Sequence, residues 1–415
     1  MHLLLRLGYA SIPLAFAAHF LLPRHGPHAM QTWEPLITFI LSGIGVIPLA
    51  HLMGRATGQL AERTGPTWGG LLNATFGNAA ELIIAIIALC KGMNDVVKAS
   101  LTGSILGNLL LVSGAAMLIG GWRRERQVFS KASAQTSSAL LAVAVAAALL
   151  PAIFNFTFAR TDVELLEHEE AMSIGTAIVL IAVYVLGLLF TLRTHSHIFS
   201  SRPAESPEDP SGVGEVWSVR RSVAALVVAS VLVSLVAELL VGSVESVATT
   251  MRWNELFVGC ILLAIFGNAA EQSTAVLLAR RNDMDTAMTI TYQSSLQIAL
   301  FTTPVMVLLS AILGHFGVGH TEHRLDLIFS PMEVAAVLLS VAIVIVVGLN
   351  GETNWFEGAM LLAVYAILGI TFFYIPSGKT AGYDKELSGR LTPAAPAAAV
   401  REAPVTEGMS HVTAR

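Results

Sequence analysis

Charged side chains are scarce in this sequence. Asp, Glu, Lys and Arg make up 13% of the 415 residues, whereas hydrophobic residues make up 54%, and the mean hydropathy is +0.68. A soluble domain usually carries about 25% charged residues. The composition therefore excludes an ordinary soluble protein and indicates one that lies in a lipid bilayer. The net charge of −5 is small and spread along the chain, which gives no support to nucleic-acid binding.

Cysteine and catalytic motifs are lacking as well. Cys90 and Cys260 fall in apolar segments and have no Cys or His at metal-ligand spacing, so we expect core thiols. The sequence contains no glycine-rich phosphate loop and no nucleophile–base pairing. It therefore predicts neither an enzyme nor a cofactor, and energy for any transport would come from an ion gradient.

Long apolar segments dominate the chain instead. A membrane-spanning helix needs about 20 mostly apolar residues, and on that basis we predict an all-α polytopic protein with about eleven spans. The predicted spans are Leu3–Leu22, Glu34–Met53, Trp68–Cys90, Val96–Gly120, Ala134–Phe158, Ala171–Leu192, Ser222–Val241, Glu255–Leu278, Met284–Leu313, Leu327–Leu349 and Trp355–Ile375.

The segments between the spans divide the chain into parts. Residues 1–30 resemble a signal peptide, but the long apolar run and poor cleavage pattern favour an uncleaved first helix. A linker rich in Ser, Pro and Glu, residues 193–221, separates one group of spans, 31–192, from another, 222–376. The tail, residues 377–415, has few bulky apolar residues, so we expect it to be disordered.

The pentapeptide "GNAAE" occurs twice, at Gly77–Glu81 and Gly267–Glu271, and the copies align without a gap after a shift of 190 positions. The same shift places Asp95 on Asp285 and Ser104 on Ser294. The continued register indicates an internal duplication. The copies lie on the third and eighth predicted spans, so the second half enters the membrane upside down. Inverted repeats are typical of secondary transporters, with the binding site at the midplane, although channels contain them too.

The distribution of basic residues predicts the orientation. Loops after even-numbered spans contain twelve Arg and Lys residues, and loops after odd-numbered spans contain six. Because basic loops stay in the cytoplasm, we expect the amino terminus and the linker to be cytoplasmic and the carboxyl terminus to lie outside.

Glu81 and Glu271 lie well inside their predicted spans, where an ionised carboxylate costs about 2.5–3.5 kcal/mol. No Lys or Arg stands near either in its own span. The pseudosymmetry would bring the two carboxylates together, where they repel unless a cation or protons neutralise them. Because a divalent cation and two protons exclude each other, this is the chemistry of an exchanger. In the alternative reading, each glutamate is protonated or paired and only packs helices.

Further oxygen ligands stand near both glutamates. Asn78 and Asn268 share a helix face with the glutamate three residues later, and Gly77 and Gly267 can let the helix kink or unwind and free nearby carbonyls. Such oxygens suit a hard cation such as Ca²⁺, which takes about six to eight. For the Ser and Gln residues the alternative is ordinary helix–helix hydrogen bonding. The predicted cation ligands are Glu81, Glu271, Asn78, Asn268, Ala74, Gly77, Ala264, Gly267, Ser104, Ser294 and Gln297, with Asn108 nearby.

Together with the two "GNAAE" copies, three segments resemble the calcium/cation–proton antiporters of the cation/calcium exchanger superfamily. They are "KGMNDVVKASLTGSILGNLLLVSG" (Lys91–Gly114), "LQIALF" (Leu296–Phe301) and "NGETNWFEGAMLLAVYAILGI" (Asn350–Ile370). The resemblance implies a first helix followed by two inverted five-helix repeats. It also implies a central cation site on Glu81 and Glu271 that exchanges cytosolic Ca²⁺ for protons.

Two positions depart from the family pattern. Gln272 stands where the family commonly has histidine, and Gln293 stands where relatives have glycine, so we expect effects on cation choice and pH response. The short segment before the first span favours a prokaryotic plasma-membrane protein. Monovalent Na⁺ or K⁺ exchange on the same fold, a passive cation channel and a membrane scaffold are the competing hypotheses. The oligomeric state is not predicted.

Overall fold

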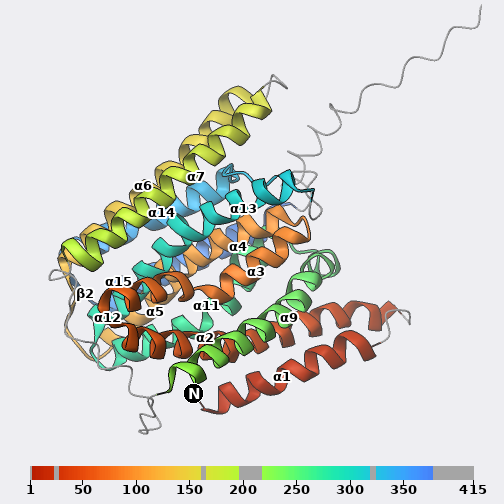
Figure 1. Ribbon diagram of the computed structural model, residues 1–415, viewed down its shortest axis with the longest axis horizontal. Helices are drawn as coiled ribbons and strands as arrows, with labels where there is room; N and C mark the ends of the chain where they lie inside the picture. Colours follow the sequence, from red (N-terminus) through yellow and green to blue (C-terminus); the bar gives the residue numbers. More distant parts are fainter. Residues whose placement is uncertain (1, 23–27, 160–164, 196–216, 318–323, 377–415) are drawn as a thin grey trace, which may run out of the picture. The chain divides into compact units, whose positions relative to one another are not determined.

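The computed structural model describes residues 2–22, 28–159, 165–195, 217–317 and 324–376, and these residues are almost entirely helical (Figure 1). The predicted all-α membrane fold is confirmed. Within the described residues, nine helices are long and apolar enough to cross a membrane, and two shorter apolar helices, Leu5–Leu21 and Ala79–Cys90, accompany them. The total of eleven spans stays a prediction. The tail and most of the linker, residues 196–216, lie outside the described residues.

The helices follow one another in two sets, before and after the linker. The first set is α1 (His2–Leu21), α2 (His28–Phe76), α3 (Ala79–Cys90), α4 (Asn94–Leu106), η1 (Gly107–Val112), α5 (Ser113–Gly121), α6 (Lys131–Phe154), η2 (Asn155–Ala159), α7 (Leu165–Leu189) and η3 (Phe190–Thr194). The second set is α9 (Val219–Met251), α10 (Glu255–Phe257), η4 (Val258–Leu263), α11 (Ala264–Arg280), α12 (Met284–Gln297), η5 (Ile298–Thr302), α13 (Thr303–His315), α14 (Pro331–Gly348) and α15 (Trp355–Phe373). The η segments are π-helical.

Two helices are longer than the apolar pattern predicted. The second span runs from Trp33 to Gly65 and the seventh from Val219 to Met251, 33 residues each. At 1.5 Å per residue such a helix is about 50 Å long, which exceeds the roughly 30 Å hydrocarbon core of a bilayer. Hydropathy marks where lipid contact ends, but the helix continues into the polar residues beyond.

The predicted third span, Trp68–Cys90, is not one straight helix, and the break that Gly77 was expected to allow is found. The chain leaves helical geometry at Gly65, with φ 83° and ψ 171°, and then forms the last turns of α2. The helix breaks again at Gly77 and Asn78 before α3 begins at Ala79. Glycine permits a positive φ that costs other residues energy, so Gly65 is the residue that lets this segment change direction.

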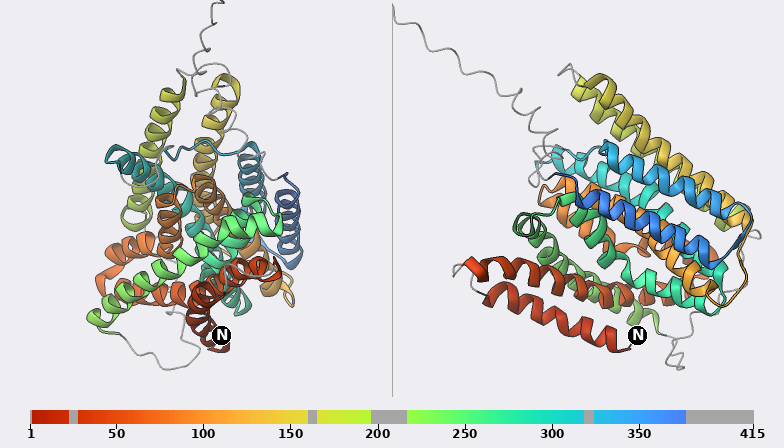
Figure 2. Two further views of the ribbon diagram at one scale, coloured as in Figure 1. Left: turned by 90° about the vertical axis from the view of Figure 1, so that its right-hand side faces the viewer. Right: turned by 180° about the vertical axis from the view of Figure 1, so that it is seen from behind.

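Helices α1, α2 and α9 pack beside one another (Figures 1 and 2). Gly8 of α1 lies against Pro48 of α2, where an added Cβ would stand 2.8 Å from the Pro48 Cδ atom. The Tyr9 hydroxyl donates to the Pro48 carbonyl at 3.3 Å. The predicted first helix is therefore packed along the second.

The two sets of helices cross most closely where α4 meets η4. A Cβ at Gly103 would stand 2.2 Å from the Cys260 carbonyl oxygen, and one at Gly259 would stand 2.5 Å from the Ala99 Cβ. Small residues at helix crossings let backbones approach. Here they bring the helix that carries Ser104 against the helix that leads into the second GNAAE segment.

A two-stranded ribbon connects two loops at one end of the helices. Strand β1 (Gln127–Val128) pairs antiparallel with β2 (Glu352–Thr353), with Gln127 opposite Thr353. Arg126 and Glu352 form an ion pair at 3.0 Å. The loops after α5 and α14 therefore lie on the same face of the helices, as expected for loops that both follow even-numbered spans.

Candidate cation site

The first GNAAE segment occupies a helix break. Gly77 and Asn78 form a turn between α2 and α3, and Glu81 lies in the first turn of α3, where it is 7% exposed. A Cβ at Gly77 would stand 2.6 Å from the Asn73 carbonyl oxygen, so this turn requires glycine. A carboxylate in the first turn of a helix is stabilised by the helix dipole, which favours Glu81 at this place.

The second GNAAE segment differs, because α11 stays helical from Ala264 to Arg280. The unwinding that we expected at Gly267 is therefore not found, although both copies have the same five residues. The Ala264 carbonyl oxygen accepts a hydrogen bond from the Asn268 side chain at 2.9 Å, so it is already partnered. Gly267 and Asn268 are buried and Glu271 is partly exposed.

The two segments meet across the repeats. Glu81 packs on Gly267, where an added Cβ would stand 3.5 Å from the Glu81 Cγ atom and 3.9 Å from its Oε1 atom. The Glu271 carboxylate is close enough to interact electrostatically with Glu81. The absence of a side chain at Gly267 thus gives Glu81 room beside the second segment.

Each asparagine of the pair contacts a serine of the other repeat. Asn78 donates its amide to the Ser294 backbone carbonyl at 3.2 Å, and the Ser294 hydroxyl donates to the Asn78 Oδ1 atom at 2.9 Å. Asn268 donates its amide to the Ser104 hydroxyl oxygen at 2.9 Å. Because Asn78 and Asn268, like Ser104 and Ser294, are 190 positions apart, the two pairs are equivalent under the repeat.

The remaining contacts differ between the halves. Asn108 donates to the Asn268 Oδ1 atom at 3.3 Å, whereas the position 190 residues later is Ile298. On the opposite side, the Gln297 Oε1 atom lies 3.2 Å from the place that a Gly77 Cβ would occupy. The Ser294 hydroxyl also contacts the Glu271 carboxyl group. The site therefore has a similar polar framework in each half but different surrounding amides.

The structure brings most of the predicted ligands together. Glu81, Asn78 and Gly77 face Ser294, Gln297 and Gly267, while Asn268 faces Ser104 and Asn108. No group of three or more His, Cys, Asp or Glu side chains is close enough to hold a metal ion in the described part of the chain. Two carboxylates surrounded by amide and hydroxyl oxygens instead suit a hard cation, which binds a mixture of charged and neutral oxygen ligands. Coordination by these residues stays a prediction.

The structure also shows where the two cysteines and the two unusual glutamines, Gln272 and Gln293, lie. Cys260 is buried, but Cys90 is exposed and is not a core thiol. Gln272 has a buried side-chain nitrogen without a hydrogen-bond partner among the described residues, and this atom lies 3.9 Å from the place of a Gly107 Cβ. Gln293 is exposed. Effects of both glutamines on selectivity stay predictions.

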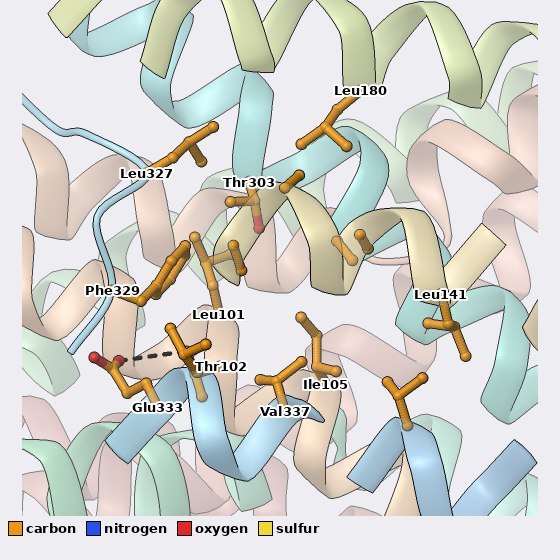
Figure 3. Close-up of a pocket in the computed structure, with 16 residues that line it drawn as sticks. Leu101, Thr102, Ile105, Leu141, Leu180, Thr303, Leu327, Phe329, Glu333 and Val337 are labelled. Atoms are coloured by element: carbon orange, nitrogen blue, oxygen red, sulfur yellow. Dashed lines mark hydrogen bonds between the residues drawn. The ribbon is translucent and has the colours of Figure 1, made fainter. Parts of the chain in front are cut away.

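The sequence analysis missed a buried carboxylate at the start of α14. Glu333 is 3% exposed and accepts hydrogen bonds from the Thr102 hydroxyl at 3.3 Å and the Ser330 backbone at 3.0 Å. Figure 3 shows its bond to Thr102 at the edge of a largely apolar cavity that the predicted cation ligands do not line. The Ser-Pro-Met-Glu sequence before an apolar run is a capping-box pattern and could have identified this residue.

The comparisons with known proteins agree with this geometry. The profile of the family described as "Sodium/calcium exchanger protein" matches residues 34–193 and 221–374. The chain belongs to this family. Both matched regions of this exchanger contain one GNAAE segment, and the gap between them contains the linker.

Individual relatives are similar to the exchanger over most of its length. The Ca²⁺/H⁺ antiporter of Synechocystis sp. is 41% identical over 88% of this chain and 95% of its own. The Ca²⁺/H⁺ antiporter ChaA of Bacillus subtilis is 39% identical over 84% of this chain and 95% of its own. Among solved structures, native YfkE is 36% identical with a TM-score of 0.71, covering 90% of this chain and 100% of YfkE.

Proposed function

We propose that this exchanger is a secondary active antiporter that exports cytosolic Ca²⁺ in exchange for protons by alternating access. The single observation that supports it most is the packing of Glu81 on Gly267 of the second GNAAE segment, within electrostatic range of Glu271, its equivalent in the other half. Relatives at about 40% identity carry the name Ca²⁺/H⁺ antiporter. A divalent cation would neutralise both carboxylates, and so would protons, but not both loads at once.

The oxygens around the carboxylates would complete the shell of the cation. Ca²⁺ takes about six to eight oxygen ligands in flexible geometry. We assign these to carboxylate, amide, hydroxyl and backbone oxygens that lie on both halves, so a bound ion would draw the halves together. The assigned residues are Glu81, Glu271, Asn78, Asn268, Ser104, Ser294 and Gln297, with backbone carbonyls of Ala74 and Gly77.

The single hydrogen of the Ser294 hydroxyl links the protonation of Glu271 to the Asn78 oxygen. The Ser294 backbone carbonyl can only accept, so the atom of Asn78 that faces it must be the amide nitrogen. The Asn78 oxygen then faces the Ser294 hydroxyl, which must donate to it. The same hydroxyl is also placed to donate to the Glu271 carboxyl group. Because it has one hydrogen, it can donate to only one of the two oxygens at a time, and both contacts are satisfied together only if Glu271 is protonated and donates in turn.

This arrangement gives a physical reason for mutual exclusion. With a proton on Glu271, the Asn78 oxygen is occupied by the Ser294 hydroxyl. When Glu271 loses its proton, the hydroxyl can rotate to donate to the carboxylate, and the Asn78 oxygen becomes available to a cation. Proton loss would thus create a negative charge and free a neutral ligand at the same time.

Alternating access is supported by the different backbones of the two GNAAE segments. One copy sits in a helix break and the other in a continuous helix. Because the two halves are nearly equivalent, each can adopt the conformation that the other has now. Such a swap of conformations would open the site to the opposite side of the membrane. We further propose a plasma-membrane location with the amino terminus and the linker in the cytoplasm, as the distribution of basic residues favours.

The test is Ca²⁺ uptake into proteoliposomes under an imposed pH gradient, with counterflow of protons followed by an internal pH dye. The proposal expects uptake that depends on the gradient and is lost in Glu81→Gln and Glu271→Gln, while Glu245→Gln, exposed on α9, keeps it. Uptake that ignores the gradient would contradict exchange and favour a passive channel. Proton counterflow driven by Na⁺ or K⁺ in place of Ca²⁺ would favour monovalent cation exchange on the same fold.

A further inference from the structure

Two π-helical segments lie at equivalent positions of the halves. The segment η1 spans Gly107–Val112, and a shift of 190 places it on residues 297–302, where η5 spans Ile298–Thr302. Both are flanked by α-helix on each side, in the middle of a predicted span. Because π-helical turns are rare and occur mostly at functional sites, their repetition at the same place indicates a selected feature.

A hydroxyl closes each of these turns in the same way. At the end of η1, the backbone amide and the hydroxyl of Ser113 both donate to the Asn108 carbonyl, the hydroxyl at 3.1 Å. The Ser113 hydroxyl also lies 3.1 Å from the Thr291 hydroxyl oxygen of the other half. At the end of η5, the amide and hydroxyl of Thr303 both donate to the Ile298 carbonyl, the hydroxyl at 2.8 Å. The donors are 190 positions apart, and so are the acceptors.

The span of five residues decides what these hydroxyls stabilise. In an ordinary α-helix a Ser or Thr hydroxyl donates to the carbonyl three or four residues earlier, as Ser340 of α14 does to Ala336 at 2.7 Å. A bond to the fifth residue back is available only in the wider π turn. Each hydroxyl is therefore placed to reinforce the π turn, because its bond to the fifth carbonyl is lost when the turn becomes α-helical and the hydroxyl must then move to a nearer carbonyl.

The π turn determines where the residues before it point. One extra residue in a turn rotates the helix before it by about 100° relative to the helix after it. Helix α5 is fixed after η1, because a Cβ at Gly114 would stand 2.9 Å from the Gly358 carbonyl of α15. A change from π to α would therefore turn Ser104 away from Asn268, and the equivalent change in η5 would turn Gln297 away from Gly77.

We propose that Ser113 and Thr303 are a matched pair of positioning residues that aim the oxygen ligands of the transported cation by holding η1 and η5 in the π form. The identity of that cation rests on the proposed function. Thr303 lines the cavity in Figure 3 together with Leu101, so η5 has space on this side in which to change its turn. Neither hydroxyl touches the cation; each acts through the rotation of the helix before it.

The experiment compares variants that differ by one hydroxyl. Thr303→Val removes the hydroxyl and keeps the shape, Thr303→Ser keeps the hydroxyl, and Ser113→Ala tests the other half. Ser340→Ala is the matched control, because it removes a buried hydroxyl from an α turn.

We expect Thr303→Val and Ser113→Ala to raise the KM for Ca²⁺ about two- to tenfold, the worth of one hydrogen bond, with kcat changed less. Thr303→Ser and Ser340→Ala should stay near the wild type. Equal KM values in Thr303→Val and Ser340→Ala would overturn the proposal.

A structure of Thr303→Val determined without Ca²⁺ separates this inference from the proposed function. We expect residues 298–302 to become α-helical and Gln297 to leave Gly77, whichever cation is carried. If the turn changes but the wild type does not exchange Ca²⁺ for protons, only the proposed function fails. If the turn stays π in the variant, the positioning role is wrong even when exchange is intact.

Discussion

Asn78 hydrogen-bonds Ser294, and Asn268, 190 positions later, hydrogen-bonds Ser104 in the opposite direction across the same interface. The two contacts exchange partners under the internal repeat, so each half supplies an amide to the other's hydroxyl. A site built in this way changes shape whenever the halves move relative to each other. Affinity for the cation is thereby connected to the conformation of the exchanger.

The hydrogen bond between Asn268 and Ser104 should contribute to cation binding. In a double-mutant cycle of Asn268→Ala with Ser104→Ala, measured as Ca²⁺ binding to the purified protein, we expect a coupling of about 0.5–1.5 kcal/mol, that of one hydrogen bond. Asn268→Ala with Ser310→Ala is the control, because the Ser310 hydroxyl instead binds the Leu325 backbone, and this cycle should be additive. Additivity in the first cycle would show that the Asn268–Ser104 contact does not support binding.

Gly77 should tolerate no side chain. A Cβ there would stand 2.6 Å from the Asn73 carbonyl oxygen, whereas one at Gly54 of the preceding helix, α2, meets nothing within 4 Å. We expect Gly77→Ala to abolish exchange because it distorts the turn that carries Asn78 and Glu81. Gly54→Ala should transport normally and gain a little helix stability. Uptake assays in proteoliposomes compare the two, and normal uptake by Gly77→Ala would mean that the break is not needed.

The crossing of α4 and η4 should dominate the stability of the central helices. A Cβ at Gly103 would overlap the Cys260 carbonyl at 2.2 Å, but one at Gly175 of α7 meets nothing within 4 Å. We expect Gly103→Ala to destabilise the detergent-solubilised protein by about 1–3 kcal/mol, the usual cost of overpacking. Its Tm should fall by several degrees relative to Gly175→Ala. Equal Tm values would contradict the close approach.

Much of the candidate site could be predicted from the sequence because it follows from the repeat. Alignment of the two halves paired Ser104 with Ser294 and Glu81 with Glu271 before any fold was known, and the structure brings these residues to one interface. The hydrophobic pattern located the spans because lipid contact requires apolar residues over a fixed length. Span ends were less accurate, because the helices continue beyond the apolar segments, as at Gly65 and Met251.

What could not be predicted depends on packing rather than on local sequence. The same pentapeptide breaks the helix at Gly77 and continues it at Gly267, so these five residues alone do not decide the backbone. The π turns before Ser113 and Thr303 leave no signal in hydropathy. Glu333 did leave a signal in its capping box, but it lies inside the predicted span Leu327–Leu349 and was not singled out there.

Proton release on Ca²⁺ binding is the most direct test of the central claim that Glu81 and Glu271 hold either a cation or protons. Purified exchanger in weakly buffered detergent solution is mixed with Ca²⁺, and a pH indicator records the protons set free. The account predicts release on binding, a Ca²⁺ affinity that rises with pH because only ionised carboxylates bind, and no release in the Glu81→Gln, Glu271→Gln double variant. Tight Ca²⁺ binding by the wild-type protein without proton release, with an affinity that stays constant from acid to alkaline pH, would contradict it.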